Sequence, residues 1–125
     1  MNNQPAPEKE LTPATALTLQ IIDFLNQKGH YATRILTAGI YNEETGQWEK
    51  SGVERGTADI HACIFSVHVS IEIKKGRDNI RKKQARVRQR VIDAGGQYIA
   101  IRDLAEFQSW YQSIALNLKP QKQCS

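Results

Sequence analysis

Two neighbouring segments with a strict alternation of apolar and polar residues constrain the fold of this chain more than any other feature. In residues 58–64 the even positions are apolar, and in residues 67–74 the odd positions are apolar. The apolar positions are Ala58, Ile60, Ala62, Ile64, Val67, Val69, Ile71 and Ile73. Because the repeat is two residues, alternate side chains point to opposite faces of a strand. The short stretch Phe65-Ser66 therefore predicts a hairpin of two paired strands.

The other elements follow from helical periodicity and from turn residues. Thr12-Pro13 predicts the start of a helix, and Gly29 predicts its end. We predict a strand over residues 31–37, a helix from Asp78 to Ala94, a strand over 97–101 and a helix over 104–116. A hairpin that includes Trp48 is a looser interpretation of the polar residues 39–56. The order α-β-β-β-α-β-α predicts an α/β domain, in which helices flank a mixed sheet.

Length and composition limit the classes of protein that this chain can belong to. Its 125 residues are enough for one domain, which we place at residues 12–118 between a mobile N-terminal tail (1–11) and a C-terminal tail (119–125). No apolar run reaches the roughly 20 residues that span a bilayer, and no secretory signal is visible. Cys63 and Cys124 form no metal-binding motif, so we expect free thiols in a bacterial or phage-encoded cytoplasmic protein, with Cys63 packed in the interior.

Positive charge is concentrated in one segment. Residues 74–90 carry a net charge of +8, whereas the rest of the chain carries −4. A basic stripe on an acidic body is typical of a surface that binds a polyanion. The same run could also be the solvated face of a helix.

Three charged residues on the two alternating strands suggest a catalytic group. Glu72 and Lys74 share one strand face, and Asp59 joins them if the two strands pair. Two adjacent carboxylates repel each other, so the arrangement favours a bound divalent cation, Mg²⁺ or Mn²⁺. With a neighbouring ammonium, such a site is suited to phosphodiester hydrolysis. The alternative is that these are outward-facing side chains of a half-exposed strand.

Several short motifs in order resemble the VRR-NUC branch of the PD-(D/E)XK nuclease superfamily. They are Gly56-Thr57-Ala58-Asp59, Ile71-Glu72-Ile73-Lys74, Gln84 and Ala94-Gly95-Gly96-Gln97-Tyr98. The likeness covers roughly residues 12–102, and Arg34 also resembles a recurrent arginine of the family. The resemblance implies a restriction-endonuclease-like core, with Asp59, Glu72 and the Ile73 carbonyl as metal ligands. It further implies Lys74 as the catalytic lysine and Gln84 as a residue that points at the metal or at the scissile phosphate.

Two positions depart from the family pattern. Ala58 stands where the family usually has proline, and the first helix has Thr15 near the position of a common glutamate, with Asp23 as its only acid. The number of metal ions, one or two, therefore stays open. Gln84 is also expected to face the sheet on independent grounds, because it falls within the apolar stripe formed by Ile80, Val87 and Val91.

These observations together predict an Mg²⁺-dependent DNA endonuclease. The resemblance implies a homodimer that acts on branched DNA such as a Holliday junction. The residues expected to hold phosphates are Arg34, Lys75, Arg77, Arg81, Lys82, Arg86 and Arg88. His61 and His68 could contact phosphate or water, and Trp48, Trp110 and Tyr111 could stack on bases. Two alternatives remain open: a non-catalytic nucleic-acid-binding module with the nuclease fold, and a regulatory protein whose basic helix binds an acidic partner.

Overall fold

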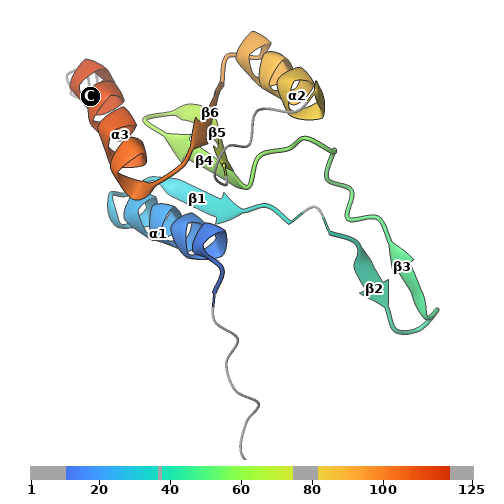
Figure 1. Ribbon diagram of the computed structural model, residues 1–125. Helices are drawn as coiled ribbons and strands as arrows, with labels where there is room; N and C mark the ends of the chain where they lie inside the picture. The colour runs from blue at the N-terminus through green and yellow to red at the C-terminus, as the bar shows by residue number, and fades with distance from the viewer. Residues whose placement is uncertain (1–10, 37, 75–81, 119–125) are drawn as a thin grey trace, which may run out of the picture.

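A mixed four-stranded sheet forms the centre of the computed structural model, which describes residues 11–36, 38–74 and 82–118 (Figure 1). The strand order is β1-β4-β5-β6, with only β5 and β6 parallel. The strands of this sheet are β1 (Tyr31–Arg34), β4 (Ile60–Ile64), β5 (Val67–Ile73) and β6 (Gln97–Ile101). The predicted α/β class is confirmed.

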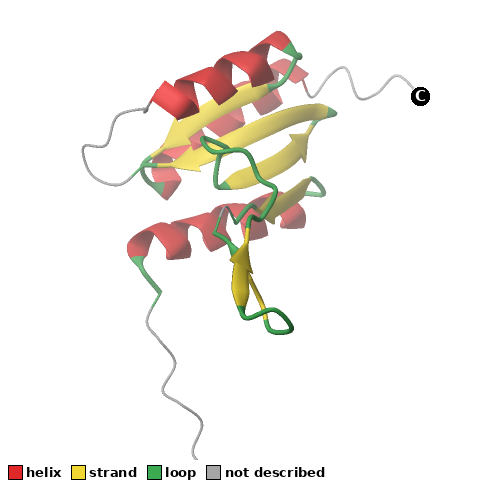
Figure 2. Ribbon diagram, turned by 90° about the vertical axis from the view of Figure 1, so that its right-hand side faces the viewer, coloured by secondary structure: helices red, strands yellow, loops and turns green. Residues whose placement is uncertain are grey.

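Helices cover the two faces of the sheet unequally (Figure 2). The helices are α1 (Pro13–Gln27), α2 (Lys82–Asp93) and α3 (Leu104–Leu118). Helices α1 and α3 pack together on one face, and α2 connects β5 to β6 across the other face. None of the helices in the described ranges is long and apolar enough to cross a membrane.

The hairpin of β4 and β5 has the predicted register and turn. Ile60 pairs with Ile71, and Ile64 pairs with Val67. Phe65 and Ser66 both have positive φ, 50° and 70°, as the tight turns of two-residue hairpins require. Because register fixes which side chains share a face, this turn determines the composition of both faces of the sheet.

The main hydrophobic core lies between the sheet and the pair α1 and α3. Alternate residues of β4 and β5 enter it, and Phe107 of α3 lies at its centre, with no exposed surface. Its buried members are Leu17, Ile21, Leu25, Ala32, Ile60, Ala62, Ile64, Val69, Ile71, Ile73, Ile101 and Phe107. Thr12 caps α1 by accepting a hydrogen bond from the backbone N–H of Thr15 at 3.1 Å, as predicted.

A separate hairpin projects from the domain between β1 and β4 (Figure 1). It consists of β2 (Ile40–Asn42) and β3 (Gln47–Glu49), in the region where the sequence suggested a hairpin with Trp48. The rings of Tyr41 and Trp48 meet edge to face at 5.4 Å, and Trp48 remains 72% exposed.

Three local predictions are wrong. The strand predicted over residues 31–37 ends at Arg34, after which the backbone N–H of Ile35 bonds to the Asp59 carbonyl. Ala58 packs beneath α2 with Val87 and Tyr98, because the chain bends at Asp59 before β4 begins. Cys63 is exposed, since it shares the face of His61, on the α2 side of the sheet, where none of the described elements covers it.

Some predictions fall outside the described residues. They are most of the N-terminal tail, the C-terminal tail from residue 119, and the predicted start of the second helix at Asp78. Within the described part of that helix, α2 begins at Lys82 and ends at Asp93, one residue short of the predicted end.

Candidate active site

The point where β4 and β5 separate brings Asp59 and Glu72 together. The register that pairs Ile60 with Ile71 places Asp59 opposite Glu72. Asp59 is the residue just before the first residue of β4. There the Asp59 carboxylate accepts a hydrogen bond from the backbone N–H of Ile73 at 2.8 Å. A side chain thus replaces the backbone partner that a longer β4 would have supplied, and this bond fixes Asp59 beside Glu72.

The carbonyl of Ile73 lies on the same edge of β5 as this N–H. In an antiparallel pair the N–H and C=O groups of one residue point toward the same neighbouring strand. The backbone N–H of Lys74 points the other way and bonds to the Ile101 carbonyl of β6 at 2.9 Å. The carbonyl oxygen that the resemblance implies as a ligand is therefore on the side of the two carboxylates.

Gln84 of α2 connects Glu72 to Lys74. The ammonium of Lys74 donates to the Oε1 atom of Gln84 at 2.7 Å. The amide nitrogen of Gln84 donates in turn to the Oε2 atom of Glu72. The expectation that Gln84 faces the sheet is confirmed, and its two amide ends match the charges that they meet.

Two charged side chains are buried in this cluster. Glu72 is 8% exposed and Lys74 is 6% exposed. Burial, reinforced by the negative charge of Asp59, raises the pKa of Glu72 from 4.5 to about 7, and the nearby Lys74 only partly opposes this shift. A carboxyl with so high a pKa lies in an environment that favours a bound proton or a bound cation.

A glycine allows α2 to approach closely enough for Gln84 to reach the strands. The backbone of Gly56, at φ +92°, touches the first turn of α2, and a Cβ there would lie 2.6 Å from the carbonyl carbon of Lys83. Tyr98 of β6 donates its hydroxyl hydrogen bond to the Gly56 carbonyl at 3.2 Å. Burial, together with the charges of Glu72 and Asp59, raises the pKa of Tyr98, so its hydroxyl stays protonated.

A cavity of about 630 Å³ opens over this cluster. Asp59, Glu72 and Gln84 lie in its wall, and Lys82 and Lys83 of α2 flank it. Arg55 also lines the cavity, although the sequence prediction did not include it. The sequence signal that could have identified Arg55 is its position next to Gly56. The backbone of Gly56 touches α2, so the preceding residue is held near that helix.

The residues expected to bind phosphate are only partly described. Three of them, Lys82, Arg86 and Arg88, are exposed on α2. Arg34 is exposed at the last position of β1, where it pairs with Ile60, the neighbour of Asp59. Lys75, Arg77 and Arg81 lie outside the described residues. Arg90 forms an ion pair with Glu54, with N–O distances of 2.5 and 2.7 Å, and both side chains are exposed.

The donor set fits a hard divalent cation that keeps part of its water shell. Within residues 11–36, 38–74 and 82–118, no three His, Cys, Asp or Glu side chains lie close enough to hold a metal by themselves. Two carboxylates and one backbone carbonyl are all-oxygen donors. Mg²⁺ is commonly held by one or two carboxylates, with water and substrate phosphate as its remaining ligands. Asp59, Glu72 and the Ile73 carbonyl meet that requirement.

The two histidines share the sheet face with the carboxylates. Their rings lie 5.0 Å apart, and the Nε2 atom of His68 is hydrogen-bonded to the Ser70 hydroxyl at 2.8 Å. Burial lowers the pKa of both histidines, and His68 adds to the effect on His61. Trp110 and Tyr111 pack against the main core, which leaves Trp48 as the exposed member of the three aromatics considered for base stacking.

Comparisons of the chain with protein-family models, with curated proteins and with solved structures find no match.

Proposed function

We propose that this protein is a metal-dependent nuclease that hydrolyses phosphodiester bonds in DNA. One observation carries the proposal: Asp59, Glu72 and Gln84 line one cavity, and Gln84 is hydrogen-bonded to both Glu72 and Lys74, although the four residues come from three separate segments. Burying Glu72 and Lys74, with Asp59 beside them, costs free energy that a purely structural role does not explain. The resemblance to VRR-NUC nucleases, based on the same residues, supports this function.

Each residue of the cluster has a part in the proposed reaction. Asp59, Glu72 and the Ile73 carbonyl would hold Mg²⁺, with Mn²⁺ as a substitute. When bound, such a cation polarises phosphoryl oxygens and lowers the pKa of a coordinated water. Hydrolysis forms a bond from the water oxygen to phosphorus and breaks the bond from phosphorus to one sugar oxygen. The water loses a proton to solvent, and the leaving sugar oxygen takes up a proton from solvent.

Lys74 and Gln84 act on the charge that develops during this reaction. The ammonium of Lys74, held by Gln84, stabilises negative charge on the phosphoryl group. The amide of Gln84 orients the Glu72 carboxylate and so keeps one of its oxygens in a fixed direction. Because both contacts come from one side chain, Gln84 positions the acid and the amine relative to each other.

The basic residues around the cavity favour a nucleic-acid substrate over a small phosphate ester. Lys82, Lys83 and Arg86 form an exposed positive surface on α2, next to the carboxylates. Contacts of this kind bind the backbone without reading the sequence of bases. We therefore propose recognition of DNA by shape, with branched DNA such as a four-way junction as substrate and a cytoplasmic homodimer as the active form.

A cleavage assay with a defined set of substrates tests this function. The protein is incubated with linear, flapped, supercoiled and four-way-junction DNA and with an RNA duplex, in Mg²⁺, in Mn²⁺ or in EDTA. We expect cleavage of branched DNA with either metal and none in EDTA. Lys74→Ala and Glu72→Ala should each abolish cleavage, which separates this activity from that of a contaminating nuclease.

Glu43→Gln is a matched control, because Glu43 is exposed in the turn of the small hairpin. This variant should cleave like the wild type. Binding to DNA that survives EDTA and Glu72→Ala, without cleavage by the wild-type protein in any metal, would instead establish the non-catalytic binding module. Preferential cleavage of the RNA duplex would overturn the assignment of DNA.

A further inference from the structure

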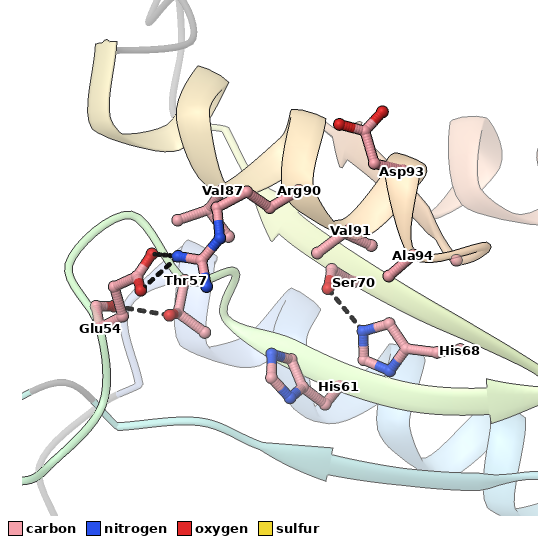
Figure 3. A pocket seen from close by; sticks show the side chains of 11 residues that line it. Glu54, Thr57, His61, His68, Ser70, Val87, Arg90, Val91, Asp93 and Ala94 are labelled. Atoms are coloured by element: carbon pink, nitrogen blue, oxygen red, sulfur yellow. Dashed lines mark hydrogen bonds and ion pairs between the residues drawn. The ribbon is translucent and has the colours of Figure 1, made fainter.

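A second cavity, of about 710 Å³, lies next to the candidate active site, beneath the C-terminal half of α2 (Figure 3). The candidate reaction uses none of the side chains that form its walls. Its volume lies within the range typical of small-molecule pockets. Eleven residues line it, and its two facing walls include His61, His68 and Ser70 on the sheet and Val87, Val91 and Ala94 on α2.

The two walls of this cavity differ in chemistry. The rings of His61 and His68 rise from the sheet toward α2, and Val87 and Val91 face them from the helix (Figure 3). The hydroxyl of Ser70, hydrogen-bonded to His68, lies buried at the base. A flat heteroaromatic ring suits such a space, because it can stack on imidazole and aliphatic groups and form hydrogen bonds at its edge.

A glycine closes one end of the cavity. A Cβ at Gly96 would lie 3.0 Å from both the Cγ1 atom of Val91 and the carbonyl oxygen of His68. A side chain at this position would force one of these neighbours to shift by a few tenths of an ångström, so glycine fits the close approach of the two walls. The separation between the helix and the histidine rings is in this way determined by backbone contact as well as by side chains.

The second cavity adjoins the candidate active site. Thr57 lines both cavities. His61 follows Asp59 by two residues, and Ser70 precedes Glu72 by two, which corresponds to about 7 Å along a strand. This distance is within the reach of the sugar and base of one nucleotide. Lys83 and Arg86 lie around the adjoining surface of α2, where they can contact neighbouring phosphates.

We propose that the second cavity binds one unpaired nucleobase of the substrate strand, next to the phosphate that is cleaved; this inference rests on the proposed nuclease function. We call it the base pocket. A base within a duplex is stacked on both faces and paired at its edge, so it reaches a pocket roofed by a helix only after leaving the stack. The base pocket thus gives a physical reason for a preference for flaps, junctions and single strands.

The test measures binding in EDTA, so that neither cleavage nor metal affects the result. The probe is a single-stranded oligonucleotide with one 2-aminopurine, whose fluorescence changes with stacking, and a duplex of the same sequence is the comparison. We expect the wild type to change the fluorescence of the single strand and to bind it more tightly than the duplex. Val91→Trp, which fills the pocket, should weaken single-strand binding about 5- to 100-fold and leave duplex binding unchanged.

Ile92→Trp is the matched control, because Ile92 is the next residue of α2, is 42% exposed and does not line the pocket. It should bind both DNA forms like the wild type. His68→Ala removes a ring from an exposed position, so it tests the pocket without disturbing the core. It should also weaken single-strand binding selectively.

The outcomes distinguish the base pocket from the nuclease proposal. If Val91→Trp and His68→Ala bind single strands as tightly as the wild type does, or weaken single-strand and duplex binding equally, the base pocket is refuted even if the protein cleaves DNA. If selective binding is present but Mg²⁺ supports no cleavage, the nuclease proposal fails and the base pocket stands. Absence of any DNA binding overturns both.

Discussion

The ammonium of Lys74 lies 2.7 Å from the amide oxygen of Gln84, a residue of α2 that follows Lys74 by 10 positions in the sequence. The amide nitrogen of the same glutamine donates to Glu72. Gln84 therefore matches a positive group with its oxygen and a negative group with its nitrogen. A side chain of equal size but different charge cannot make both contacts.

Gln84→Glu should lower the cleavage rate about 10- to 100-fold, the range seen when a residue that supports a metal ligand is changed. The substitution preserves size but places a third carboxylate beside Glu72 and Asp59. The Mg²⁺ concentration for half-maximal activity should change as well, because the position of Glu72 is altered. Steady-state kinetics at several Mg²⁺ concentrations measure both effects; an unchanged Mg²⁺ dependence would remove the positioning role.

The raised pKa of Glu72 predicts an unusual dependence of stability on pH in the absence of metal. The carboxyl titrates near 7 in the folded protein and near 4.5 ordinarily, so between these values the folded state holds the extra proton. The free energy of unfolding should therefore fall as the pH rises from 4.5 to 7. In EDTA, the Tm difference between Glu72→Gln and the wild type should therefore shift in favour of the variant as the pH rises from 4.5 to 7.

The same titration has the opposite effect on metal binding. A ligand carboxyl must lose its proton before it holds Mg²⁺. Stabilisation of the wild type by Mg²⁺, measured as a shift in Tm, should consequently be larger at pH 8 than at pH 6. Equal shifts at the two pH values would show that Glu72 is ionised throughout.

Gly56→Ala should displace the first turn of α2 and so separate Gln84 from the strands. The added Cβ would meet the Lys83 backbone, which cannot rotate away, and the positive φ of the site adds strain. We expect a loss of cleavage together with a lower Tm. Gly52→Ala is the comparison, since Gly52 also has positive φ but no atom of the described residues lies within 4 Å of where its Cβ would be. Equal loss of cleavage in both variants would point to strain alone.

The exposed arginines of α2 should determine the salt dependence of DNA binding. Each phosphate contact adds about 0.9 to the slope of log K against log salt concentration for duplex DNA. Replacing Arg86 and Arg88 together by Gln should lower that slope by up to about 2 and weaken binding to all sequences alike. Lys28→Gln, at the end of α1 on the other face of the sheet, should leave the slope unchanged.

Phe107→Ala should destabilise the fold by about 3 to 5 kcal/mol, because Phe107 is fully buried between α1, α3 and the sheet. Its ring contacts Phe24 edge to face at 5.6 Å, so the loss includes aromatic packing. Urea denaturation measures the change in free energy. Leu116→Ala, at an exposed position of α3, should change stability by about 0.5 kcal/mol or less.

The alternating segments made much of this arrangement predictable. The register of β4 and β5 follows from the positions of Ile60 and Ile71, and it places Asp59 opposite Glu72 without further information. The placement of Gln84 followed from the apolar stripe of α2, because a polar residue within a buried stripe must face the sheet. In both cases a local periodicity determined a long-range contact.

Other features depended on tertiary structure that periodicity does not encode. Ala58 follows the even-residue pattern in the sequence, but the chain has left the strand at that point and the residue packs under α2. Cys63 keeps its strand position and is exposed, because α2 contacts β6 and does not extend across the sheet to cover it. The walls of the base pocket lie on elements whose separation is determined by glycine contacts, and no pattern of residue types predicts that separation.

Helices α1 and α3 seal one face of the sheet, and the cavity lined by Asp59, Glu72 and Gln84 opens on the other face. A single chain consequently offers one nicking centre, which meets one backbone per encounter. Severing both strands would take two chains, or two successive visits by the same one. The ratio of nicked to linear plasmid early in a digest, followed against protein concentration, reports directly on this asymmetry.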